Sequence, residues 1–70
     1  MEKVENSKVY VEVEYEDESS FSFDLVPNAD SSNEYQGIVM MVTRGALLSS
    51  TGVKATAYNT DGFPIVQYVK

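Results

Sequence analysis

The stretch KVYVEVEYE, residues 8–16, alternates between apolar and polar side chains without interruption. Its odd-numbered members after Lys8 are apolar: Val9, Val11, Val13 and Tyr15. Its even-numbered members carry polar tips: Tyr10, Glu12, Glu14 and Glu16. Because side chains of a strand point alternately to its two sides, this period predicts a strand with one buried face.

A second alternating stretch follows closely, with Phe21, Phe23 and Leu25 apolar, and Pro27 ends it. The two strands are expected to form a hairpin in which odd residues face odd residues, since any other register mixes the faces. A three-residue loop over residues 17–19 pairs Tyr15 with Phe21 and places Glu12 opposite Asp24. A five-residue loop also keeps the faces separate.

The segment from Tyr35 to Ser50 allows two interpretations. Ser31 and Glu34 have the spacing of a capping box, Gly52 is placed as a C-terminal cap, and a helical stripe joins these signals. The stripe consists of Tyr35, Ile38, Val39, Val42 and Ala46. Internal glycines and β-branched residues favour instead a buried strand over residues 38–43 followed by a loop. We expect the helix, because two independent end signals agree with its period.

A second hairpin is predicted from residues 53–59 and 63–69, with Asn59 opposite Phe63 and Gly62 at a turn position that needs a positive φ. One face would carry Val53, Ala55, Ala57, Phe63, Ile65 and Val69, interrupted only by Gln67. The other face would carry Lys54, Thr56, Tyr58, Val66 and Tyr68.

The order of elements is therefore strand, strand, helix, strand, strand. It predicts one α+β domain over residues 1–70, with a four-stranded, mostly antiparallel sheet and one helix packed across one face. Residues 1–7 are expected to form a flexible lead-in.

Composition narrows the classes of function. The chain has 70 residues, a net charge of −6, and neither cysteine nor histidine. The acidity argues against direct nucleic-acid binding and against anionic membranes. The N-terminus does not read as a signal peptide, and no apolar run is long enough to span a membrane. A cytoplasmic protein is expected, in the host cytoplasm if the source is viral.

Catalytic chemistry has little support in the residues present. The serines have no histidine to activate them, and the glutamates of the first strand lie on an open face where nothing separates their pKa values. We therefore expect a protein that is not an enzyme, with no catalytic residue, metal or cofactor.

Acidic residues suggest a site for a protein partner. Ten acids and two bases lie in residues 1–35, against one acid and three bases in residues 36–70. The outer face of the first hairpin would gather Glu12, Glu14, Glu16 and Asp24. This face could occupy a basic surface on a target protein, or it could be a solvated face that discourages edge pairing.

The back of the expected helix is apolar as well and carries Met40, Met41, Arg44, Leu47 and Leu48. A helix that is apolar on both sides needs cover on both sides, which in so small a fold points to a homo-oligomer.

A small anionic ligand is the alternative partner. Ser49, Ser50 and Thr51 could offer hydroxyls beside Arg44 and Lys54, with Tyr58 and Tyr68 supplying rings. Tyr10, Tyr58 and Tyr68 are expected on the outer face of the sheet.

These observations define the expected function as non-enzymatic binding. The first hypothesis is a small acidic inhibitor or adaptor that oligomerises and occupies a basic site on a protein target. The second is an oligomeric sponge for an anionic, nucleotide-like molecule, and the third is a structural subunit of a larger particle. In size and charge the chain resembles the small acidic proteins with which phages block host machinery, a resemblance that transfers no residue roles.

Overall fold

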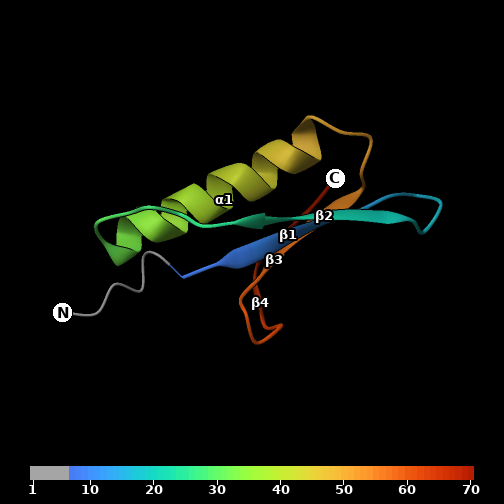
Figure 1. Cartoon of the computed structure of the whole chain (residues 1–70). Coiled ribbons are helices and arrows are strands. Elements are labelled where there is room, and N and C mark those ends of the chain that lie inside the picture. The colour runs from blue at the N-terminus through green and yellow to red at the C-terminus, as the bar shows by residue number, and fades with distance from the viewer. Residues whose placement is uncertain (1–6) are drawn as a thin grey trace.

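The computed structural model describes residues 7–70, so the expected lead-in lies, apart from Ser7, outside the described residues. Five elements follow one another: β1 (Val9–Glu14), β2 (Ser20–Leu25), α1 (Ser32–Leu48), β3 (Lys54–Tyr58) and β4 (Pro64–Val69). The strands form one antiparallel sheet in the order β2-β1-β3-β4, with α1 across one side (Figure 1). The predicted ββαββ architecture is confirmed.

Strand β1 lies inside the sheet and supplies the centre of the core. Its apolar side chains Val9, Val11 and Val13 are almost fully buried, as the alternation predicts. Val9 and Val11 pack with Val39 and Ala57, while Val13 packs with Leu47 and Ala55. Side chains of α1 therefore pack against both ends of β1.

The first hairpin keeps the predicted parity but not the predicted register. Val13 pairs with Phe21 and Tyr10 with Asp24, so the strands are shifted by two residues from the Tyr15–Phe21 and Glu12–Asp24 pairing. The loop is Glu16-Asp17-Glu18, closed by the bond from Tyr15 N to Ser19 O at 2.9 Å. Glu18 takes a positive φ of 72°, and the Asp17 carboxylate accepts from both the N–H and the hydroxyl of Ser19.

The segment after the first hairpin is a helix, and the alternative strand over residues 38–43 is wrong. Ser31 is the N-cap, and its hydroxyl accepts from Glu34 N at 3.2 Å. The Glu34 carboxylate accepts from Asp30 N at 2.8 Å, which is the N–H one residue before the N-cap. The bond from Glu34 N satisfies one of the first-turn N–H groups that have no partner within the helix, and the bond from Asp30 N fixes the chain that leads into it.

The helix ends earlier than Gly52 predicts. Ser49 is the C-cap, and Gly52 lies three residues beyond it against β1. A Cβ on Gly52 would collide with Val13 Cγ1. Glycine is therefore required there for close packing and not as a helix cap.

The buried side of α1 is rotated from the predicted stripe. Val39, Thr43 and Leu47 are the buried residues of the helix, and the Thr43 hydroxyl donates to Val39 O at 2.6 Å. Leu47 was expected on the outer side but is only 3% exposed. The rotation follows from the position of the helix, which packs on β1, β3 and β4.

The second hairpin has the predicted turn but contains a β-bulge. Asn59 N bonds to Phe63 O, and Gly62 has the expected positive φ, of 81°. The register shifts between Ala57 and Tyr58. The predicted faces of β4 are therefore wrong: Val66 and Tyr68 pack against the core, and Gln67 donates to the Thr56 hydroxyl across the strands.

Strand β2 lies farther from α1 than the other three strands do, although Phe23 and Leu25 still pack against the core cluster that contains Val39 of the helix. No Cα atom of β2 comes within 8 Å of a Cα atom of α1, whereas β1, β3 and β4 all do. This gap decides where the molecule presents apolar surface.

Candidate functional site

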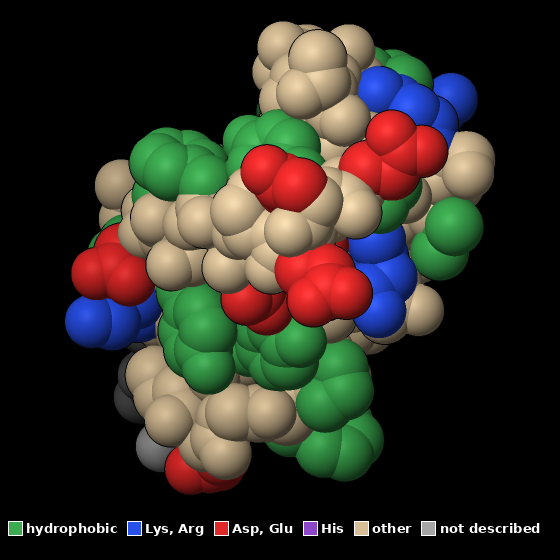
Figure 2. Space-filling model, turned by 90° about the vertical axis from the view of Figure 1, so that its right-hand side faces the viewer, with side chains coloured by type: hydrophobic (Ala, Val, Ile, Leu, Met, Phe, Trp, Pro, Cys, Tyr) green, Lys and Arg blue, Asp and Glu red, His purple; other side chains and the backbone are tan. Residues whose placement is uncertain are grey.

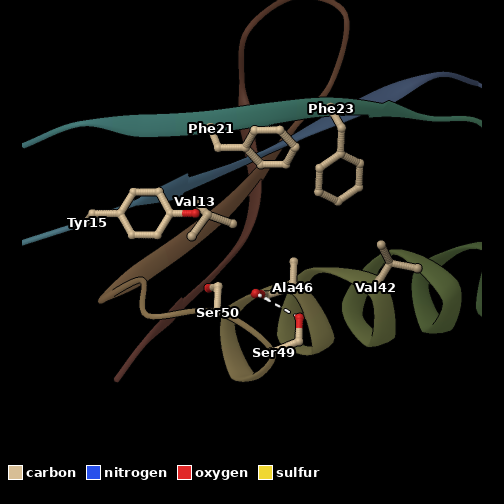
Figure 3. A pocket seen from close by; sticks show the side chains of 8 residues that line it. All are labelled: Val13, Tyr15, Phe21, Phe23, Val42, Ala46, Ser49 and Ser50. Carbon is tan, nitrogen blue, oxygen red and sulfur yellow. Dashed lines mark hydrogen bonds between the residues drawn. The ribbon is translucent and has the colours of Figure 1, made fainter.

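An open apolar groove lies between β2 and α1. It has a volume of about 350 Å³ and is lined by Val13, Tyr15, Phe21, Phe23, Val42, Ala46, Ser49 and Ser50. Phe21 and Phe23 point from the strand toward the helix, and Val42 and Ala46 point back toward the strand (Figure 3). We call this hollow the β2–α1 groove.

The groove is open because apolar side chains on the helix side of β2 are only partly covered by α1. Phe21 is 56% exposed although it lies on the same side of the sheet as the buried valines of β1. Its ring lies 5.9 Å from that of Phe23 in a tilted arrangement. The sequence predicts both residues to be core, so their alternation could not reveal that the helix leaves them open.

The four predicted acidic residues are not one continuous stripe. Glu12 lies opposite Ser22 and Thr56, whereas Glu14 forms an exposed ion pair with Lys54 at 3.6 Å. Asp24 is opposite Tyr10 and therefore diagonal to Glu12, and its carboxylate lies 3.7 Å from the Lys8 ammonium. Exposed pairs of this kind contribute little stability, and they partly neutralise the face.

Glu16 belongs instead to the hairpin loop, which carries three consecutive carboxylates: Glu16, Asp17 and Glu18. We call these residues the acidic loop. A second hollow beside it is lined by Tyr15, Glu16, Asp17, Ser19 and Thr51, and it shares Tyr15 with the β2–α1 groove. The view from this side of the molecule shows several acidic side chains on the surface, with apolar side chains near them and Lys or Arg side chains beside some of them (Figure 2).

One carboxylate of the acidic loop, that of Asp17, is hydrogen-bonded within the hairpin. The two bonds from Ser19 lower the pKa of Asp17 below its usual range, and the larger effect comes from the hydroxyl. Of the ion pairs found in residues 7–70, none involves a carboxylate of this loop. The loop therefore presents negative charge to solvent at the end of the groove.

The predicted oligomer interface is only partly on the surface. Leu47 belongs to the core, but Met41 is 66% and Leu48 64% exposed, and Met40 and Arg44 are exposed beside them. A shallow hollow of about 340 Å³ lies between this side of α1 and β4 and is lined by Met40, Met41, Arg44, Gly45, Leu48 and Tyr68.

The predicted ligand residues are not brought together. Tyr58 stacks on Tyr10 at 5.2 Å on the outer face of the sheet, whereas Tyr68 packs on the helix side, against the expectation that all three share one face. Lys54 is paired with Glu14. Ser49 and Ser50 donate to helix carbonyls of Ala46 and Leu47, and Thr51 lies in the following loop.

Two kinds of feature are absent from residues 7–70. This part of the chain holds no group of three or more acidic, histidine or cysteine side chains placed to bind a metal ion. It also holds no helix with the length and apolar character needed to cross a bilayer. What the fold does bring together is an apolar groove, an open strand edge and an acidic loop.

Comparison with protein-family models, with curated protein sequences and with solved structures returned no match for this chain. The function must therefore be argued from the site itself.

Proposed function

We propose that this chain is a non-enzymatic binding domain, acting as an adaptor or inhibitor, that docks on a basic segment of a protein target in the cytoplasm. The observation that carries the proposal is the position of the acidic loop at the end of the β2–α1 groove, with Tyr15 common to both hollows. Apolar contact and negative charge are thereby offered to the same partner.

Each part of this surface supplies a different part of the binding free energy. Exposed apolar side chains such as Phe21 gain by being removed from water, at about 25 cal/mol per Å². The carboxylates of the acidic loop attract a cationic partner and bias its orientation as it approaches. A target with apolar and basic side chains in one segment satisfies both requirements.

The proposal predicts that a charge at the acidic loop matters more than the same charge elsewhere. The probe is a blocked heptapeptide of alternating lysine and valine, with a glutamate–valine twin as the negative control. Glu16→Gln should weaken binding of the lysine peptide about two- to fivefold, because a single exposed charge contributes up to about 1 kcal/mol. Fluorescence anisotropy at low salt measures the effect.

Asp61→Asn is the matched control, because Asp61 is an exposed acid in the loop of the other hairpin. It removes the same charge and should leave the affinity unchanged. Equal affinities for the two variants, or equal binding of the glutamate twin, would contradict the proposed function.

We also propose that two copies associate through the outer side of α1. The helix carries one acid, Glu34, and one base, Arg44, whereas the whole chain has a net charge of −6. Two copies can therefore meet here with little like-charge repulsion. In an antiparallel pair centred on Met41, Gly37 of one copy faces Gly45 of the other, and a side chain at either glycine would meet nothing within the monomer.

Sedimentation equilibrium tests this association. The wild type should show a reversible increase in mass with concentration, and Met41→Glu should abolish it by placing two like charges at the crossing point. Asn33→Glu adds the same charge at the exposed start of the helix and should leave the association intact. A wild-type mass of one chain at all concentrations would rule out this interface.

A further inference from the structure

The backbone of β2 has a free side. Two hydrogen bonds show which residues of β1 bond to which neighbouring strand. Tyr15 N bonds to Ser19 O, so the odd-numbered residues of β1 bond toward β2. Val53 N bonds to Glu14 O, so the even-numbered residues bond toward β3. Because hydrogen-bonded and non-bonded pairs alternate in an antiparallel ladder, Phe21, Phe23 and Leu25 bond to β1. The N–H and C=O groups of Ser20, Ser22 and Asp24 then face the open edge.

The two edges of the sheet are not equally protected. Strand β4 begins at Pro64 and contains the register shift, with Ile65 as the extra residue opposite Ala57 and Tyr58, and both features discourage pairing with another strand. Strand β2 pairs regularly with β1 over all six of its residues and contains neither proline nor lysine. The open edge of β2 is therefore the one suited to receive another strand.

A strand added at this edge would meet two different surfaces. Neighbouring strands lie about 4.8 Å apart, so its inward side chains would reach the β2–α1 groove beside Phe21 and Phe23. Its outward side chains would lie beside Ser20, Ser22 and Asp24, with Glu12 one strand further, at about 10 Å. Lysine and arginine are long enough to extend over the small Ser22 toward that carboxylate.

We propose that the open edge of β2 binds an extended segment of a partner protein in which apolar residues alternate with lysine or arginine. The inference rests on the proposed function and adds to it the place and the backbone conformation of the bound segment. Main-chain hydrogen bonds provide affinity in this mode, and alternate side chains provide specificity.

Charge favours a foreign partner over a second copy at this edge. The outward residues of a second β2 would be Ser20, Ser22 and Asp24, which bring no cation to a face that already carries Glu12.

The test uses the same lysine–valine heptapeptide and a version methylated on alternate backbone nitrogens. Methylation keeps the charge and the side chains but removes the donors that pair with β2, so affinity should fall at least about tenfold, as expected for losing several hydrogen bonds of about 1 kcal/mol each. This comparison uses the wild-type protein and does not depend on the folding of a variant.

A pair of protein variants tests the same edge by changing β2 in place of the peptide. Ser22→Pro removes the N–H that Ser22 directs to the open edge of β2, without removing a hydrogen bond to β1. Ser22→Ala keeps that N–H. We expect Ser22→Pro to weaken peptide binding severalfold and Ser22→Ala to leave it unchanged, with circular dichroism reporting the fold of both.

The outcomes separate the two proposals. If the methylated peptide binds as well as the parent while Glu16→Gln still weakens binding, strand addition is overturned and the proposed function stands. If the wild type binds no lysine–valine peptide, both fail. If the free protein doubles its mass and Ser22→Pro abolishes the doubling, the edge is occupied by a second copy and a foreign strand is excluded.

Discussion

At the scale of single residues, the two hairpin loops have the same pattern of backbone hydrogen bonds. They differ in the residue that takes a positive φ, which is Glu18 in the first loop and Gly62 in the second. Glu18 N bonds to Tyr15 O in the first loop, and Gly62 N bonds to Asn59 O in the second. The φ angles at these donors are 72° and 81°. Glycine adopts this region without a steric penalty, whereas glutamate does not.

This difference predicts opposite effects of two substitutions. Glu18→Gly should raise the free energy of unfolding by about 1 kcal/mol, because it relieves the left-handed strain. Gly62→Ala should lower it by about the same amount. Urea denaturation measures both, and a destabilised Glu18→Gly variant would show that the loop does not have this conformation.

The same residue explains an error of prediction. Gly62 indicates its turn because it is glycine, and that turn is confirmed. Glu18 has no such mark, so the sequence could restrict the parity of the first hairpin but could not distinguish registers that differ by two residues. Gly52 was misread for a related reason, since a glycine near a helix end can serve either as a cap or as a point of close packing against Val13.

At the scale of elements, α1 shows what periodicity can and cannot determine. The cap at Ser31 and the apolar spacing predict the helix, and its start and type are confirmed. Its rotation depends on which strands it covers. Because β2 lies farther from α1 than the other strands do, Val42 and Ala46 line the groove, and Leu47 takes the buried position instead.

Two neighbouring leucines test this rotation. Leu47→Ala should lower the free energy of unfolding by about 2–4 kcal/mol, since it leaves a cavity in the core. Leu48→Ala, at a side chain that is 64% exposed, should change it by less than about 0.5 kcal/mol. Similar losses for the two variants in urea denaturation would contradict the orientation of α1.

Strand β4 illustrates a second limit. Strict alternation from Phe63 to Val69 is valid only without a bulge, and the bulge near Tyr58 exchanges the two faces. The single sign in the sequence was Gln67, a polar residue on a face read as buried. In the structure it lies on the outer face and bonds to Thr56.

At the scale of the whole molecule, the separation of charge along the chain predicts an acidic surface but not its place. The fold divides the predicted set, since Glu14 and Asp24 acquire cationic neighbours while Glu16 joins the acidic loop. The β2–α1 groove could not be predicted, because it arises from the strand order and from the larger distance between β2 and the helix. The candidate binding surface therefore depends on the tertiary arrangement of the elements.

The central claim is that a basic, extended partner segment binds at the open edge of β2. Residue-resolved amide hydrogen exchange, recorded with and without the lysine–valine peptide, tests it most directly. The account predicts new protection at Ser22 and Asp24 and little change at Phe21 and Phe23, whose amides already bond to β1. Protection that is uniform along β2, or confined to α1, would contradict it.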